Sequence, residues 1–360
     1  MRFLVFLLGL SALLAAICTY WLHSFNHFSE VDRAFDGQCS PFTGLDGPSD
    51  IEIDTSQGIA YISSKAYRAS TPTTSQGTSA GTGAERGKIY GITLNDPLNN
   101  DGFRDRTGGI PSLFRPGGID FYEGEGLRQL FVVNEATNGI ELFDVSEAGE
   151  LSHFKTITDP RLTSPKSVVA VGPEQFYVTN DVKLGGTFVQ ITAQLLTGNN
   201  AGEVFYLDKG TVSLVAKDLR IASGLELSRD GTTLYVAETA AKAIKVYDRN
   251  PADGLLSDAG LIKLEAAPDN IALDEAGDLW IGAHPKLLMS GPHPAGSGST
   301  APSKVYRVTS KGEAIVIYAD PGKELSASTI AVRFGDQMLV GGRMDPKFLI
   351  CQLPSKANRS

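Results

Sequence analysis

Polar residues stand directly before six short apolar segments of this 360-residue chain. These pairs are Ser49 and Asp50, Gly117 and Gly118, Lys166 and Ser167, Ser223 and Gly224, Asp269 and Asn270, and Ser328 and Thr329. A second polar set ends the strand-like segment that follows each pair, and its members are Ser63 and Ser64, Asn134 and Glu135, Asn180 and Asp181, Glu238 and Thr239, His284, and Arg343. Such groups line hydrated ligand sites, although the same residue types also cap strands in turns.

These residues could carry acid–base and electrophilic chemistry on a small molecule. Lys166, Asp269 and Asn270 could polarise a substrate carbonyl, and Glu135 or His284 could activate water. The remaining candidates for ligand contact are Ser49, Ser167, Ser223, Asp181 and Glu238. No serine of either set lies in a G-x-S-x-G motif and no cysteine falls in either set, which disfavours an acyl-enzyme on serine or cysteine at these positions.

Calcium is the cofactor that this residue set could hold. The ion takes roughly six to eight oxygen ligands, and Asp50, Asp269 and Asn270 offer carboxylate and amide oxygens. Lys166 opposes a metal because its ammonium group repels a divalent cation at short range. The same charge could instead replace the metal by neutralising both aspartates, so the sequence leaves both alternatives open.

An internal repeat predicts how these residues come together. Six hairpins share an apolar strand, a turn rich in Asp, Gly or Glu, and a second strand of aromatic and β-branched residues; they start at Asp50, Gly118, Ser167, Gly224, Asn270 and Ile330. A further hairpin between repeats, such as 243–247 with 260–264, gives four strands per unit. We therefore expect an all-β six-bladed β-propeller with four-stranded blades, since an open sandwich has no reason to repeat six times. The innermost strands then begin around one end of a channel.

The net charge of −9 disfavours a nucleic-acid partner, so a small-molecule substrate or ligand is expected. Residues 3–22 form an apolar run long enough to cross a bilayer as a helix. We expect residues 1–28 to form a hydrophobic helix that serves as a retained signal anchor, with a cleaved signal peptide as the alternative. Residues 29–360 would form the propeller, which we expect to be extracytoplasmic. The protein would then be either membrane-anchored or secreted. Nothing in the sequence specifies an oligomeric state.

Two cysteines lie near the two ends of the expected propeller. Closing a ring of blades brings the chain ends together, so in an oxidising compartment Cys39 and Cys351 are predicted to form a disulfide. Two unrelated buried thiols are the alternative.

The chain resembles the serum paraoxonase and arylesterase family, whose members are calcium-dependent lactonases with a six-bladed propeller and an N-terminal hydrophobic anchor. The resemblance is most specific in VVAVGPEQFYVTND (Val168–Asp181), DNIALDEAGDLWIGAHP (Asp269–Pro285), FRPGGI (Phe114–Ile119) and the two terminal cysteines. Gluconolactonase-like and strictosidine-synthase-like propellers are the nearest alternatives. The resemblance implies a carboxylic ester hydrolase of the arylesterase or lactonase type.

The family's metal ligands carry over only in part. Asp269 and Asn270 match two calcium ligands, and Asp50 matches the aspartate of a structural calcium site. Other family positions are changed: a ligand glutamate is Ser49, an Asn-Asp pair is Lys166-Ser167, a ligand asparagine is Ser223, two histidines are Gly117 and Glu135, and a free cysteine is Ala283. We therefore expect a lactone or aryl ester hydrolase with an altered mechanism. A non-catalytic binding propeller and a strictosidine-synthase-like, non-hydrolytic enzyme with Glu238 or Glu135 as acid–base residue are the alternatives.

Overall fold

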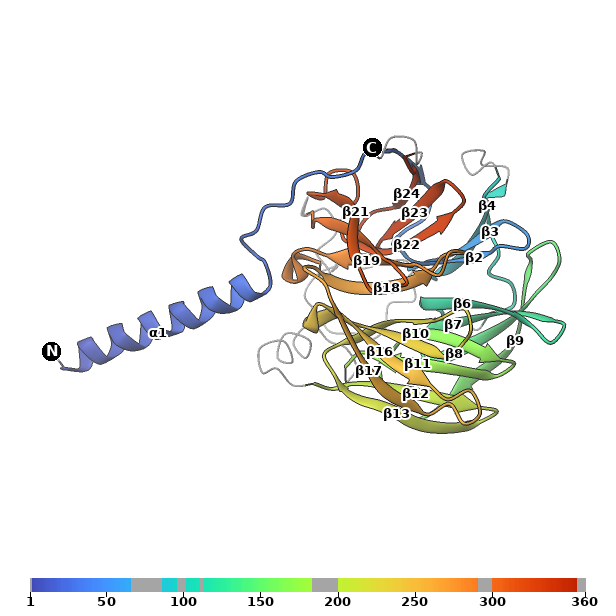
Figure 1. Cartoon of the computed structure of the whole chain (residues 1–360), viewed down its shortest axis with the longest axis horizontal. Helices are drawn as coiled ribbons and strands as arrows, with labels where there is room; N and C mark the ends of the chain where they lie inside the picture. Colours follow the sequence, from blue (N-terminus) through green and yellow to red (C-terminus); the bar gives the residue numbers. More distant parts are fainter. Residues whose placement is uncertain are drawn as a thin grey trace, which may run out of the picture.

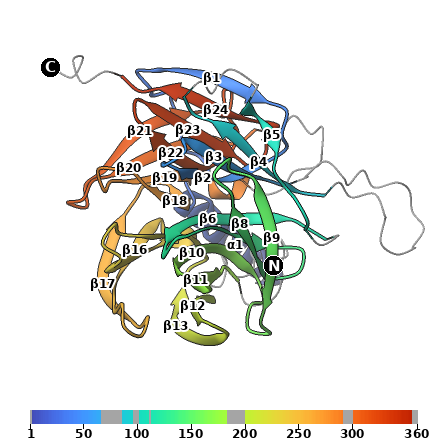
Figure 2. The ribbon, with the colours of Figure 1, turned by 90° about the vertical axis from the view of Figure 1, so that its right-hand side faces the viewer.

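The computed structural model describes residues 2–65, 86–95, 102–110, 113–182, 200–290 and 300–354. Its strands form six four-stranded antiparallel sheets, each joined to the next through their innermost strands, with the last sheet beside the first. Figure 2 shows the sheets arranged around a common centre in the order of the chain. The predicted six-bladed β-propeller with four-stranded blades is confirmed.

Each blade contains an innermost, a second, a third and an outer strand. The innermost strands are β2 (Pro48–Asp54), β6 (Pro116–Gly124), β10 (Pro165–Gly172), β14 (Ala222–Leu227), β18 (Ala267–Leu273) and β22 (Ser328–Phe334). The second strands are β3 (Ile59–Ser64), β7 (Leu127–Asn134), β11 (Gln175–Asn180), β15 (Thr233–Glu238), β19 (Leu279–His284) and β23 (Gln337–Gly342).

The third and outer strands complete the blades. The third strands are β4 (Lys88–Thr93), β8 (Gly139–Val145), β12 (Gly202–Asp208), β16 (Ala243–Arg249), β20 (Ser303–Val308) and β24 (Lys347–Gln352). The outer strands are β5 (Arg104–Asp105), β9 (Leu151–Thr158), β13 (Thr211–Leu219), β17 (Leu256–Lys263), β21 (Ala314–Asp320) and β1 (Gln38–Thr43). The hairpin expected at 243–247 and 260–264 is formed by β16 and β17.

Apolar layers between neighbouring blades form the core. Phe131 and Val133 of one blade pack against Phe176 and Val178 of the next, and all four are fully buried. Both faces of a blade are therefore covered, because strand side chains alternate between the two faces. Blades approach one another most closely near the channel, where a Cβ at Gly118 would lie 2.7 Å from the Cα of Ser167.

The first strand of the propeller closes the last blade. β1 pairs with β24, and their register places Cys39 opposite Cys351. The two cysteines form the predicted disulfide, which links positions separated by 312 residues in sequence. A disulfide in this position fits an oxidising, extracytoplasmic compartment.

A helix precedes the propeller, as expected from the apolar N-terminus. α1 (Arg2–Ser24) projects away from the blades (Figure 1). At its end Phe25 packs against Ile221, and Lys242 Nζ donates a hydrogen bond to the Ser24 carbonyl at 2.7 Å. Across the described part of the chain, no helix combines the length and the apolar character needed to cross a membrane. The membrane anchoring predicted for residues 1–28 stays a prediction.

Candidate active site

A β-bulge interrupts each innermost strand near its start. The register shifts fall between Pro48 and Asp50, Pro116 and Ile119, Pro165 and Val168, Ala222 and Leu225, Pro268 and Ile271, and Ser328 and Ile330. These intervals contain or border every polar pair that the sequence places before the innermost strands. A bulge re-aims the side chains that it contains. We call this end of the channel, at which the innermost strands begin, the mouth.

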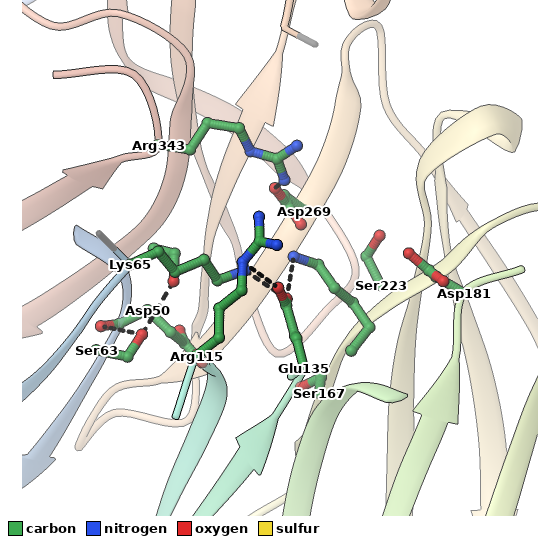
Figure 3. Close-up of polar contacts among 12 residues, drawn as sticks. Asp50, Ser63, Lys65, Arg115, Glu135, Ser167, Asp181, Ser223, Asp269 and Arg343 are labelled. Carbon is green, nitrogen blue, oxygen red and sulfur yellow. Dashed lines mark hydrogen bonds and ion pairs between the residues drawn. The ribbon is translucent and has the colours of Figure 1, made fainter. Parts of the chain in front are cut away.

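Asp269 accepts hydrogen bonds from two basic residues at the mouth. Its Oδ2 lies 3.1 Å from His284 Nε2 and 2.7 Å from a terminal guanidinium nitrogen of Arg343 (Figure 3 shows the arginine). Burial alone would raise the pKa of Asp269, but the charges of Lys166 and Arg343 and the hydrogen bond from His284 hold it well below its usual range. Asp269 is therefore an ionised, buried carboxylate.

His284 is neutral in this arrangement. Burial lowers the pKa of its imidazole, and this effect outweighs the opposing influence of Asp269. Nε2–H then donates to Asp269, which leaves Nδ1 as the proton acceptor. Among the described residues Nδ1 has no hydrogen-bond partner. The pair therefore has the arrangement of a general base oriented by a carboxylate.

Glu135 lies among three cationic side chains. Lys65 Nζ donates a short hydrogen bond to Glu135 Oε1, Lys166 Nζ lies 3.9 Å from the same atom, and Arg115 Nε lies 3.7 Å from Oε2 (Figure 3). Burial opposes ionisation, yet the charges of Lys65 and Lys166 lower the pKa of Glu135. A carboxylate held in this way is a weak base, so its main effect is to balance the lysine charges.

The mouth position of Glu135 has counterparts in other blades. Each lies directly after a second strand, and the set is Lys65, Glu135, Asp181, Thr239 and Arg343. Lys65 and Arg115 were missed by sequence reasoning, although the spacing that places Glu135 and Arg343 at the mouth places Lys65 there too. Arg115 precedes β6, and no repeat position marks it.

In three blades the side chain of the last residue of the second strand accepts a hydrogen bond from the loop before the innermost strand. The Asn134 and Asn180 side chains accept hydrogen bonds from the Arg115 and Ser164 amides, at 3.1 and 3.3 Å. Glu238 Oε1 accepts in the same way from the Arg220 amide, at 2.9 Å. The contact seen for Glu238 thus holds the loop before β14.

Asp181 also contacts a loop, because Ser164 Oγ donates a short hydrogen bond to its Oδ1. Burial raises the pKa of Asp181, against the opposing effects of Ser164 and Lys166.

The small polar residues of the mouth bond mainly to one another and to the backbone. Ser49 Oγ lies 3.0 Å from Ser63 Oγ, Ser223 Oγ lies 2.6 Å from Thr239 Oγ1, and Ser167 Oγ accepts from the Leu225 amide at 3.1 Å. These serines are buried. Their contacts join strands of the same or adjacent blades, which is a structural role at the predicted ligand positions.

Asp50 uses both carboxylate oxygens in the same manner. Oδ1 accepts from the Ile51 amide at 3.1 Å and Oδ2 from the Ile119 amide of the next blade at 2.9 Å. Burial raises the pKa of Asp50 to about 7 despite these two hydrogen bonds. Asp50 therefore ties β2 to β6 and titrates near neutrality.

The donor set fits calcium poorly. Asp50 has both oxygens bonded to amides, and Asp269 Oδ2 is shared by His284 and Arg343. Within the described residues the buried oxygens left without a partner at the mouth positions are Asp269 Oδ1, Asn270 Oδ1 and Thr329 Oγ1, whereas calcium takes roughly six to eight. No group of three or more His, Cys, Asp or Glu side chains in this part of the chain could hold a metal.

The six blades and the charged residues at the start of the innermost strands define a six-bladed propeller with a polar mouth. The chain belongs to the arylesterase family, whose sequence pattern matches residues 46–353. It is 31% identical over 347 residues to human serum paraoxonase/arylesterase 1, covering 91% of this chain and 92% of that protein. It is also 31% identical over 339 residues to mouse serum paraoxonase/lactonase 3, covering 90% and 91%.

A solved structure of a gluconolactonase from Xanthomonas campestris shares the fold. Its TM-score is 0.58 at 16% identity, covering 89% of this chain and 91% of that one. The family resemblance inferred from the sequence is confirmed, and it supports a lactone or ester hydrolase at the family level.

Proposed function

We propose that the chain hydrolyses lactones or aryl esters at the mouth. The Asp269–His284 pair acts as the general base, and the Lys166 ammonium group stabilises the negative charge on the carbonyl oxygen. The observation that carries this proposal is the hydrogen bond between His284 Nε2 and Asp269 Oδ2. It orients a neutral imidazole whose Nδ1 can accept a proton. Because the donor set fits calcium poorly, no step is assigned to a metal.

The proposed reaction uses one proton acceptor and one fixed positive charge. Water attacks the carbonyl carbon as His284 Nδ1 takes its proton, and the electron pair moves to the carbonyl oxygen beside the Lys166 ammonium group. The intermediate collapses by breaking the ester C–O bond, and His284 returns the proton to the leaving alkoxide. The Asn270 Oδ1 atom can accept a hydrogen bond from the water.

Glu135 supports this chemistry indirectly. Its carboxylate lies near the ammonium groups of both Lys65 and Lys166, so it stabilises their charged forms. Its lowered pKa makes His284 the better base.

The test is turnover of a panel of lactones and aryl esters by matched variants. We expect Asp269→Ala and His284→Gln to lower kcat/KM by roughly 10²–10⁴-fold, the usual contribution of general base catalysis. Asp230→Asn, in an exposed turn, is the control and should keep full activity. Since burial lowers the pKa of His284, activity should persist below pH 6.5. Undiminished turnover by Asp269→Ala would contradict the proposal.

A binding propeller without hydrolysis is the second candidate. The serines of the mouth are bonded to each other, and Glu135 is surrounded by cations, so few side chains are left for catalysis. This function predicts that lactones raise the Tm without being consumed. Product formation above the uncatalysed rate decides between the two.

A further inference from the structure

Charged side chains from five blades lie at the mouth in two ion-paired groups, one around Glu135 and one around Asp269. We call Lys65, Glu135, Arg115, Lys166, Asp269 and Arg343 the mouth network. Lys65 follows β3, Glu135 follows β7, Lys166 lies in β10, Asp269 in β18, and Arg343 follows β23. Figure 3 shows Lys65 and Arg115 directed toward Glu135, and Arg343 directed toward Asp269.

The contacts within the mouth network are largely shielded from water. The Lys65 and Asp269 side chains are only 3% and 2% exposed and Lys166 is 12% exposed, whereas Arg343 and Arg115 reach the solvent at 25% and 55%. Ion pairs in such surroundings are weakly screened by salt, and a charge left without its partner there is costly. Lys166 connects the two halves of the network, since it lies near Glu135 and its charge also acts on Asp269.

A central metal ion would link the same strands in a different way. It would draw oxygen ligands from several innermost strands toward one point, which requires those oxygens to be available. Here Asp50 and the mouth serines bond to amides and hydroxyls, while one Asp269 oxygen is bound by Arg343. Among the described residues only Asp269 Oδ1, Asn270 Oδ1 and Thr329 Oγ1 are left as buried mouth oxygens without a partner, too few for the ion, and positive charge is already present.

We infer that the mouth network replaces a central metal ion, so that this propeller folds and remains stable without calcium. Lys166 supplies the positive charge between Glu135 and Asp269. Lys65 pairs with Glu135, and Arg343 pairs with Asp269. This inference does not depend on the proposed hydrolysis, because it concerns what holds the mouth together.

The first experiment measures metal content and stability of the full chain. After purification with calcium-containing buffers and desalting, we expect far less than one calcium per chain by elemental analysis. Neither EDTA nor millimolar calcium should shift the Tm. Stoichiometric calcium, or a Tm that falls in EDTA and recovers with calcium, would overturn the inference.

The second experiment changes the central charge. Lys166→Asn removes the ammonium group and adds an amide oxygen, so we expect a lower Tm that millimolar calcium partly restores. Lys155→Asn is the matched control, because Lys155 Nζ pairs with Glu174 at 2.6 Å on an exposed surface. Lys155→Asn should leave the Tm unchanged, and calcium should not shift the Tm of this variant.

A Lys166→Asn variant as stable as the parent chain would count against the inference. If that variant fails to fold, Arg343→Gln takes its place, and a parental Tm for Arg343→Gln would count against it equally. The chelator experiment on the parent chain decides independently of any variant. None of these readouts uses turnover, so failure of the proposed hydrolysis leaves them unaffected.

Discussion

Three carboxyl groups lie just beyond the bulges on their innermost strands: Glu52, Asp120 and Glu226. Burial raises the pKa of Asp120 to about 6, and burial together with neighbouring negative charges raises the pKa values of Glu52 and Glu226 well above their ordinary range. In the unfolded chain these groups titrate near pH 4. The folded chain therefore holds protons that the unfolded chain releases, and stability falls as the pH rises from about 4 through 7.

Replacing one of these carboxyl groups should remove part of that pH dependence. We expect Glu226→Gln to raise the free energy of unfolding at pH 8, because burial raises the pKa of the carboxyl group that it replaces and the folded chain must there hold a buried charge. At pH 5 the change should be small, since the carboxyl group is then protonated. Denaturant unfolding at both pH values measures the difference. The exposed Glu147→Gln is the control, and an equal effect of Glu226→Gln at both pH values would contradict the assignment.

Asp269 and Glu135 change the stability of the chain with pH in the opposite direction. Their pKa values are lowered, so their contribution to stability is present at neutral pH and is lost only as the pH falls below about 4. The two groups of acids together place the greatest stability of the chain in mildly acidic solution.

Loops at the mouth owe their position to the ends of the second strands. Asn134 accepts from the Arg115 and Ala136 amides, and its Nδ2 donates to Glu141 Oε1 at 2.7 Å and to the Leu113 carbonyl at 3.0 Å. One buried amide therefore holds both chain segments that carry Arg115 and Glu135.

Asn134→Ala should loosen this pair of segments. We expect a loss of about 1–3 kcal/mol, because Glu141 and two backbone amides lose a buried partner. Amide hydrogen exchange of residues 113–115 and 135–136 should quicken more than exchange elsewhere. Asn250→Ala, in an exposed turn, is the matched control. Unchanged exchange in both segments would show that the backbone alone fixes them.

The sequence predicted which elements reach the mouth better than it predicted what they contact. Hairpin repeats and glycine turns are local signals, so the blades were predicted correctly, and Lys166 and Asp269 lie in the innermost strands β10 and β18. The partners of Glu135 come from three blades, and the repeat places Lys65 at the mouth without showing that it pairs with Glu135. Contacts between residues so far apart depend on side-chain directions set by the bulges, which the pattern of residue types does not encode.

For the whole molecule, the pairing of β1 with β24 is what closes the ring. Reduction of Cys39–Cys351 should lower stability by on the order of 4–5 kcal/mol in the loop-closure model, since the cross-link spans 312 residues. Thermal unfolding with and without reductant measures this effect, and Cys39→Ser should reproduce it without reductant. Cys18→Ser is the control because Cys18 is a free, exposed thiol. An identical Tm in both redox states would contradict this role.

The same pairing governs when the protein can finish folding. A ribosome makes β1 before any other strand of the propeller and its partner β24 after all the others. The backbone hydrogen-bonding groups along β1 therefore lack their partner strand until β24 has been made. The five blades built from consecutive strands can form as they emerge, but the sixth cannot be completed until β24 has been made. Chains that terminate before residue 347 lack β24, so their ring of blades cannot close. We expect such chains to aggregate or to be degraded by proteases.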